Sequence, residues 1–338
     1  MLRVNQKTLE SIMLINIFKK NYPLQLLLLV LVPLVLWIPA FVNPPELFRT
    51  IFDMPLYDVV YSWAYGFNTI ASICAFVIVV LQALFLNYMM TRNHLCQKTT
   101  FFPAFLYIIL MSCNVQTMTF SAVLFANLCL IIALHFFFKC HDKNEGIDEI
   151  FQSSFFLALA SLFYAPYVLF IFWMWAGLIV YKLYKWRSWG MSILGLLTPF
   201  LLLAVFYYLK DIPVEAKMFS NVEKWIDINF DFLDIPLQVV YIVLLVMFMI
   251  PALGNTLSSR SNRIIEYRKK SGVMVSMFVV SLFPFFLSKT YPNMSFIFAI
   301  PLSFFFCNMF MNLNKERYAN TFLLIFVFCC IAKIYMSL

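Results

Sequence analysis

Four charged residues stand close together in the stretch VNPPELFRTIFDMPLYD, residues 42–58, directly after a long apolar run. Three of them are carboxylates, Glu46, Asp53 and Asp58, and the fourth is Arg49. Two carboxylates about two helical turns apart can flank a small polar substrate, with one acting as a base, or can hold a divalent cation through oxygen ligands. Glu46, Asp53 and Asp58 are therefore the candidate catalytic residues of this chain.

The same stretch also has the pattern of a short amphipathic helix. Pro44 and Pro45 suit the first turn of a helix, and Pro55 would end it. Its two faces would carry Leu47, Phe48, Ile51 and Phe52 on one side, and Glu46, Arg49, Thr50 and Asp53 on the other. Such a helix lies in the membrane interface, where Arg49 pairs with Glu46 and Asp53 and the charges need no catalytic role.

The composition excludes a water-soluble domain. Of 338 residues, 63% are hydrophobic and only 12% are charged, whereas soluble chains have about 25% charged residues. Runs of about 20 apolar residues recur, each long enough to cross roughly 30 Å of hydrocarbon. The sequence predicts an all-α polytopic transmembrane bundle of about 11 spans, within a range of roughly 10 to 12. The predicted segments are 23–42, 64–90, 101–112, 119–138, 150–163, 167–183, 189–209, 235–254, 272–287, 293–312 and 318–336.

The Lys and Arg residues between these segments indicate a cytoplasmic N-terminus. With that orientation eighteen of the 24 cations are cytoplasmic, so the net charge of +8 reflects topology and not nucleic-acid binding. We expect residues 1–22 to be a cytoplasmic segment without a cleavable signal, and residues 23–338 to be one multi-pass domain. The outer loops, 43–63 and 210–234, then carry nine of the 16 carboxylates.

A basic cytoplasmic loop, residues 255–271, carries five cations. They are Arg260, Arg263, Arg268, Lys269 and Lys270. The topology rule alone accounts for them. Alternatively, they bind anionic lipid headgroups or an acidic partner, since each cation near such a surface contributes about 1 kcal/mol.

Metal and nucleophile motifs give little support to other chemistry. His94, Cys96, Cys140 and His141 are zinc-type ligands in two predicted cytoplasmic loops, but their spacing matches no standard zinc motif, so we predict no metal. The sequence has no G-x-S-x-G, P-loop or H-E-x-x-H motif. Most of the eight cysteines fall inside predicted spans, where a thiol behaves as a small hydrophobe, so no disulfide framework is expected.

The polar residues inside the predicted spans are uncharged. They include Gln82, Asn87, Asn127 and Asn308, which suit hydrogen bonds between helices. Pumps and transporters commonly need ionisable groups within the membrane, and no Asp, Glu, Lys or Arg lies deep in any segment. Ion-coupled transport is therefore the less favoured function.

Several apolar blocks resemble a family of uncharacterised bacterial polytopic inner-membrane proteins. These are MLINIFKKNYPLQLLLLVLV from Met13, LQALFLN, FFPAFLYIILMSC, FQSSFFLALASLFYAPY and WRSWGMSILGLLTPF. The resemblance covers most of the chain and implies a location in the bacterial inner membrane. Some members are labelled beta-carotene monooxygenase, but membrane oxygenases hold iron with several histidines, and this chain has only His94, His135 and His141.

A looser resemblance is to the membrane glycosyltransferases that use lipid-phosphate sugar donors. That class also has a first span, an outer loop with an acidic residue and an interfacial helix, and then many spans, some of them short. By position, the resemblance implies that Glu46, Asp53 or Asp58 is the catalytic acid and that Arg49 meets a donor phosphate. This chain lacks the adjacent acidic pair and the large soluble domain of that class.

Two functions follow as expectations. The first is a membrane transferase, without a cofactor unless a divalent cation is bound, that binds or transfers a lipid-linked sugar at the outer leaflet. The second is a non-enzymatic component that assembles or stabilises an envelope complex with another membrane protein. Both imply contact with membrane lipids, and neither involves nucleic acid.

Overall fold

The computed structural model is helical wherever it describes regular structure. It describes residues 23–96, 100–113, 118–142, 146–211, 247, 249–258, 265–287 and 294–312, and residues 321, 324, 327, 328 and 331. These residues contain no β-strand, and the helices are α3 (Pro23–Val42), α4 (Pro55–Ala64), α5 (Asn68–Arg92), α6 (Phe102–Met111), α7 (Ala122–Lys139), α8 (Ile147–Phe163), α9 (Phe170–Tyr181), α10 (Trp186–Leu209), α14 (Ile265–Leu287), α15 (Met294–Ile297) and α16 (Ala299–Asn312). The described residues also include two short 3-10 helices, η2 (Cys140–Asp142) and η3 (Ala165–Leu169).

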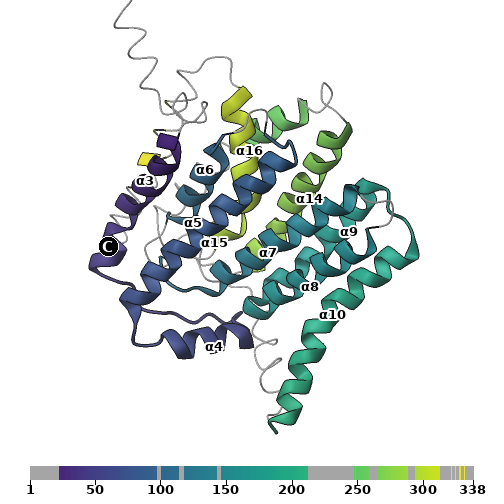
Figure 1. Ribbon diagram of the computed structural model, residues 1–338, viewed down its shortest axis with the longest axis horizontal. Helices are drawn as coiled ribbons and strands as arrows, with labels where there is room; N and C mark the ends of the chain where they lie inside the picture. Colours follow the sequence, from purple (N-terminus) through teal and green to yellow (C-terminus); the bar gives the residue numbers. More distant parts are fainter. Residues whose placement is uncertain are drawn as a thin grey trace, which may run out of the picture.

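The longer helices form a bundle, and α4 lies across one end of it (Figure 1). Helix α8 packs along α7 on one side and along α10 on the other, while α9 packs on α14. Helix α6 packs against both α5 and α16. The end that carries α4 is the end at which α5 begins and α10 finishes (Figure 1).

Three of these helices are long and apolar enough to cross a membrane: α5, α7 and α10. At 1.5 Å per residue, the 25 residues of α5 extend about 37 Å. Its exposed residues Ile70, Ile73, Val77 and Leu81 recur at helical spacing, so the outward face of the helix is apolar. Such a face is stable beside lipid and not in water.

Most predicted segments coincide with helices to within a few residues of each end, and two regions differ more from the prediction. The segment 293–312 is interrupted, since α15 ends at Ile297 and α16 begins at Ala299. The predicted basic loop 255–271 is partly helical, because α14 begins at Ile265 and residues 255–258 are also helical, while residues 259–264 lie outside the described residues. An i,i+4 pair, Glu266 with Lys270 at 2.6 Å, favours the helix there. Residues 1–22, nearly all of the outer loop 210–234 and most of the segments 235–254 and 318–336 also lie outside the described residues.

The short third segment is a buried helix. All ten residues of α6 are buried, and at about 15 Å the helix is too short to cross a bilayer. Inside it, the Tyr107 hydroxyl donates to Gln82 Oε1 of α5 at 2.8 Å. Gln82 in turn donates through Nε2 to the Leu124 carbonyl of α7 at 2.9 Å. The predicted interhelical role of Gln82 is thus confirmed, and the same holds for Asn127, whose Nδ2 donates to the Phe296 carbonyl of α15 at 3.0 Å.

A break separates α8 from α9. Pro166 has no N–H with which to continue α8 and lies in the first turn of η3. Tyr164, between the two helices, is extended with φ −140° and ψ 110°. At this break the Phe163 carbonyl and the Ala165 N–H have partners outside α8 and η3. Backbone groups in an apolar surrounding need partners, and here the partners come from the loop that precedes α4.

Close packing of α10 on α8 depends on one glycine, and this gives a test of the fold. A Cβ at Gly195 would lie against the Ser154 side chain and 2.7 Å from the Phe151 carbonyl, whereas a Cβ at Gly190 of the same helix would meet nothing within 4 Å. We expect Gly195→Ala to lower the unfolding free energy by about 1–3 kcal/mol and Gly190→Ala to leave it unchanged or raise it slightly. Apparent melting temperatures of the two variants in detergent provide the measurement, and equal values for both would contradict this packing.

Candidate functional site

The charged stretch is an extended loop held against the break between α8 and α9. The Ala165 N–H donates to the Phe52 carbonyl at 3.0 Å, and the Met54 N–H donates to the Phe163 carbonyl at 3.2 Å. These bonds flank an antiparallel bridge between Asp53 and Tyr164. The two backbone segments thus supply each other with hydrogen-bond partners where the helix is interrupted, so Asp53 has a fixed position at this break.

The predicted helix from Pro44 to Pro55 is wrong. Residues 44–50 have no regular secondary structure, and Pro55 begins α4 instead of ending a helix. Proline suits the first turn of a helix, and Met54 before it is extended with φ −108° and ψ 166°. The short helix that was expected after the first span therefore exists, but it comprises residues 55–64, so Asp58 lies in its first turn.

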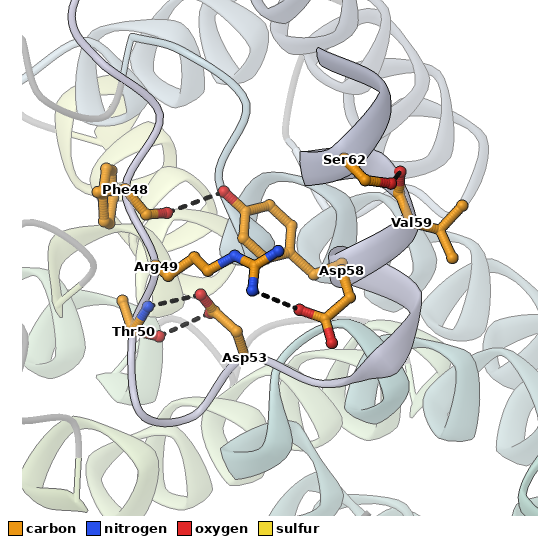
Figure 2. Close-up of polar contacts among 8 residues, drawn as sticks. Phe48, Arg49, Thr50, Asp53, Asp58, Val59 and Ser62 are labelled. Carbon is orange, nitrogen blue, oxygen red and sulfur yellow. Dashed lines mark hydrogen bonds and ion pairs between the residues drawn. The ribbon is translucent and has the colours of Figure 1, made fainter. Parts of the chain in front are cut away.

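Asp53 accepts two hydrogen bonds from Thr50. The Thr50 N–H donates to Asp53 Oδ2 and the Thr50 hydroxyl donates to Oδ1, both at 2.6 Å (Figure 2). Figure 2 shows the Asp53 carboxyl group directed at Thr50, with the Arg49 side chain beside it and Asp58 nearby.

The pKa of Asp53 is raised from 3.8 to about 7. Burial of the carboxyl group is the main cause, because a charged group loses hydration there. The Thr50 hydrogen bonds lower the pKa, the Asp58 charge raises it and the Arg49 charge lowers it. The result is a carboxyl group that exchanges a proton near neutral pH, as a general base must.

Arg49 extends beside this carboxyl group and pairs with Asp58. The distance from Arg49 Nη1 to Asp58 Oδ1 is 3.4 Å (Figure 2). The guanidinium carbon also lies 4.0 Å from the ring centroid of Tyr61. The side chains of Arg49 and Asp58 are 50% and 33% exposed. Ion pairs that are this exposed contribute about 0–1 kcal/mol, so an anionic ligand can take the place of Asp58 at the guanidinium.

Tyr57 fixes the loop to the helical core. Its side chain is fully buried, and its hydroxyl lies 3.0 Å from the Phe48 carbonyl and 3.0 Å from the Phe120 carbonyl. Burial raises the pKa of Tyr57 well above its ordinary value, so the hydroxyl keeps its proton and remains a donor. The residue on either side of Arg49 is thus bound, Phe48 by Tyr57 and Thr50 by Asp53.

The structure brings together three of the four residues predicted for this site. Arg49, Asp53 and Asp58 interact, whereas Glu46 is exposed and has no hydrogen bond or ion pair with them. Thr50, Tyr57 and Tyr61 were not predicted to take part. With Pro55 taken as a helix start, the i,i+4 spacing of Tyr57 and Tyr61 would have placed both on the face toward Arg49.

The cations predicted to contact lipid differ in their exposure and in their partners within the protein. Arg268 is exposed and Lys269 is partly exposed on α14, whereas Lys270 is buried and bound to Glu266. The hydrogen bond from Lys270 lowers the pKa of Glu266. Lipid contact therefore stays a prediction for Arg268 and Lys269, while Lys270 has a partner inside the protein. Arg260 and Arg263 lie outside the described residues.

The four zinc-type ligands do not meet at one point. The charges of His94 and His141 both lower the pKa of Glu266, so these two residues lie on the same side of the protein as Glu266. The Cys140 thiol instead contacts the Gly146 carbonyl at 3.7 Å, and Cys96 contacts Cys307. Across the described residues, no group of three or more His, Cys, Asp and Glu is arranged to hold a metal ion.

Comparison with known proteins adds no family to these observations. No family model, no curated protein and no solved structure matches the chain. The candidate site therefore has to be interpreted from its own geometry.

Proposed function

We propose that this chain is a multi-pass protein of the bacterial inner membrane with a glycosyltransferase-like helical arrangement, and that Arg49, Asp53 and Asp58 form its transfer site at the outer leaflet. The observation that carries this proposal is the pKa of Asp53, about 7, in a loop bound to a helix break beside Arg49. A solvated aspartate has a pKa near 3.9. A value near 7 is that of a group able to remove a proton from a hydroxyl during reaction.

The proposed reaction uses each residue for one task. Asp53 takes the proton of an acceptor hydroxyl while that oxygen forms a bond to the anomeric carbon of a lipid-phosphate sugar. The bond from that carbon to the phosphate oxygen breaks, and its electron pair leaves with the lipid phosphate. Arg49 replaces its contact with Asp58 by contacts with the phosphate, whose charge it neutralises. Asp58 holds Arg49 in position in the absence of donor.

Exposed aromatic residues support a position at the membrane surface. At the end of the bundle that carries α4, Trp63 is 70% exposed, and Tyr65, Phe67 and Tyr208 are also exposed. At the opposite end of α5 and the start of α10, Tyr88, Tyr184 and Trp186 are exposed. Two such groups at the ends of long apolar helices are typical of the aromatic belts at the two surfaces of a bilayer. Of the group near α4, Trp63 lies on the same helix as Asp58.

A complementation experiment tests the site. The variant with Glu46→Gln, Asp53→Asn and Asp58→Asn should accumulate in the membrane at the wild-type level and fail to restore the phenotype of a deletion strain. The expected loss rests on Asp53, the carboxyl group whose pKa burial raises to about 7. Full complementation by this variant would exclude a catalytic role for the loop.

Purification from native membranes separates this proposal from the non-enzymatic alternative. A bound polyprenyl-phosphate sugar, identified by mass spectrometry of the extracted lipid, supports the transferase. A stoichiometric second membrane protein without such a lipid supports an assembly role. The variant with Glu46→Gln, Asp53→Asn and Asp58→Asn is the control, because it replaces the three carboxylates by neutral amides and leaves Arg49 in place.

A further inference from the structure

Two thiols that are distant in sequence lie in contact at the opposite end of α5 from the charged loop. Cys96 and Cys307 are 211 residues apart, and their sulfur atoms are 3.5 Å from each other. Cys96 follows the last turn of α5 and is partly exposed, whereas Cys307 lies on α16 and is fully buried. Both are free thiols.

The turn that carries Cys96 is fixed by several bonds. Asn93 Nδ2 donates to the Met89 carbonyl at 2.7 Å, and the Leu95 N–H donates to the Met90 carbonyl at 3.0 Å. The Leu95 side chain is fully buried. The turn therefore presents the Cys96 sulfur to α16 as a defined part of the fold. Cys96 itself lies outside any helix, so its backbone can make the shift of about 1.5 Å that a sulfur–sulfur bond requires.

We propose that Cys96 and Cys307 are a redox site at which a small disulfide or peroxide oxidant is reduced. The two thiols differ in access, and this difference defines their order of reaction. Cys96, the accessible thiol, attacks as its thiolate, and Cys307, the enclosed thiol, completes the reaction. This division between an exposed and an adjacent resolving cysteine is typical of redox-sensing pairs. The inference is independent of the proposed transferase function.

With glutathione disulfide as the oxidant, the chemistry takes two steps. The Cys96 thiolate attacks one sulfur of the glutathione disulfide, a mixed disulfide forms at Cys96 and one glutathione thiolate leaves. The Cys307 thiolate then attacks the Cys96 sulfur, the intramolecular disulfide forms and the second glutathione thiolate leaves. Two protein thiols are oxidised, one glutathione disulfide is reduced, and the two thiol protons pass to the two glutathione thiolates.

The disulfide would connect the turn after α5 with α16. Helix α6 packs against both α5 and α16, so the bond would enclose the fully buried α6 between two covalently joined elements. Closing so long a loop restricts the unfolded chain. We expect oxidation to raise the apparent melting temperature by about 5 °C or more, and a reducing thiol to reverse the rise.

The test uses purified full-length protein in detergent, treated with glutathione disulfide. Remaining thiols are blocked with N-ethylmaleimide, and trypsin then releases the peptide NHLCQK with Cys96. Wild type should give this peptide linked to the peptide with Cys307. Cys307→Ser should stop at the first step and accumulate glutathione on Cys96, while Cys96→Ser should give neither product. Cys74→Ser, at another partly exposed cysteine, should behave as wild type.

Three results would overturn the proposal. The first is wild-type protein that keeps glutathione on Cys96 without forming the link. The second is a link between two chains, seen as a dimer on a non-reducing gel. The third is equal glutathione incorporation at Cys74 and Cys96. The wild-type protein alone decides the first two, by its mass spectrum and by the gel, so these tests remain valid if a serine variant fails to fold.

Discussion

Replacing Asp53 by asparagine should lower the rate of sugar transfer by about 10²- to 10⁴-fold, the contribution of a positioned general base. Asparagine keeps the size of the side chain and one acceptor oxygen for the Thr50 bonds, but it cannot take up a proton. Transfer from polyprenyl-phosphate sugars in proteoliposomes measures the effect. The matched control is Glu46→Gln, which removes an exposed carboxylate of the same loop.

The pH dependence of the wild-type rate separates a base from a merely structural carboxylate. A base acts in its deprotonated form, so with a pKa of about 7 the rate should rise as the pH increases from 6 to 8 and level off above that. A solvated aspartate would already be deprotonated at pH 6. The raised pKa also affects the free energy of unfolding. Asp53 binds its proton more tightly in the folded state than in the unfolded state, so the free energy of unfolding should fall as the pH rises from about 4 to 7. A flat rate profile from pH 5 to 8 would contradict this role for Asp53.

Replacing Arg49 by alanine should raise the KM for the lipid-phosphate donor by roughly 10- to 100-fold, because hydrogen bonds to charged groups contribute about 1.5–3 kcal/mol. Half of the Arg49 side chain is exposed, so the guanidinium is accessible to a phosphate. Loss of its charge should also raise the pKa of Asp53, since Arg49 lowers that pKa in the wild type. The rate profile should therefore move to higher pH.

Arg49→Lys separates the effect of the positive charge from that of the guanidinium hydrogen bonds. Lysine retains the positive charge but not the paired planar donors, so it should restore the position of the pH profile more fully than the KM. Substitution of Arg92, an exposed arginine on the other end of α5, controls for a general loss of positive charge. If Arg49→Ala leaves both the KM and the pH profile unchanged, the guanidinium has no part in donor binding.

The helices were largely predictable because their signal is local. The predicted segment 23–42 has the same ends as α3, and the pause between 150–163 and 167–183 falls at the break before η3. Hydrophobic runs and prolines act within a few residues, and they need no partner elsewhere in the chain. The position of α4 was different, because both Pro45 and Pro55 are acceptable helix starts by local rules. Asp53 forms a bridge with Tyr164, more than a hundred residues away, and Met54 is extended, so that Pro55 is the start.

The helical class, the apolar character and the presence of Arg49, Asp53 and Asp58 in one short stretch follow from residue types and near neighbours alone. The environment and the partners of those residues depend on the tertiary structure. Packing removed water from Asp53 and raised its pKa, the break at Pro166 gave the loop its backbone partners, and Arg49 turned to Asp58 instead of Glu46. Tertiary packing alone also brought the Cys96 and Cys307 sulfur atoms into contact. Burial and contacts between distant segments arise only when the chain is folded, so no local pattern could contain them.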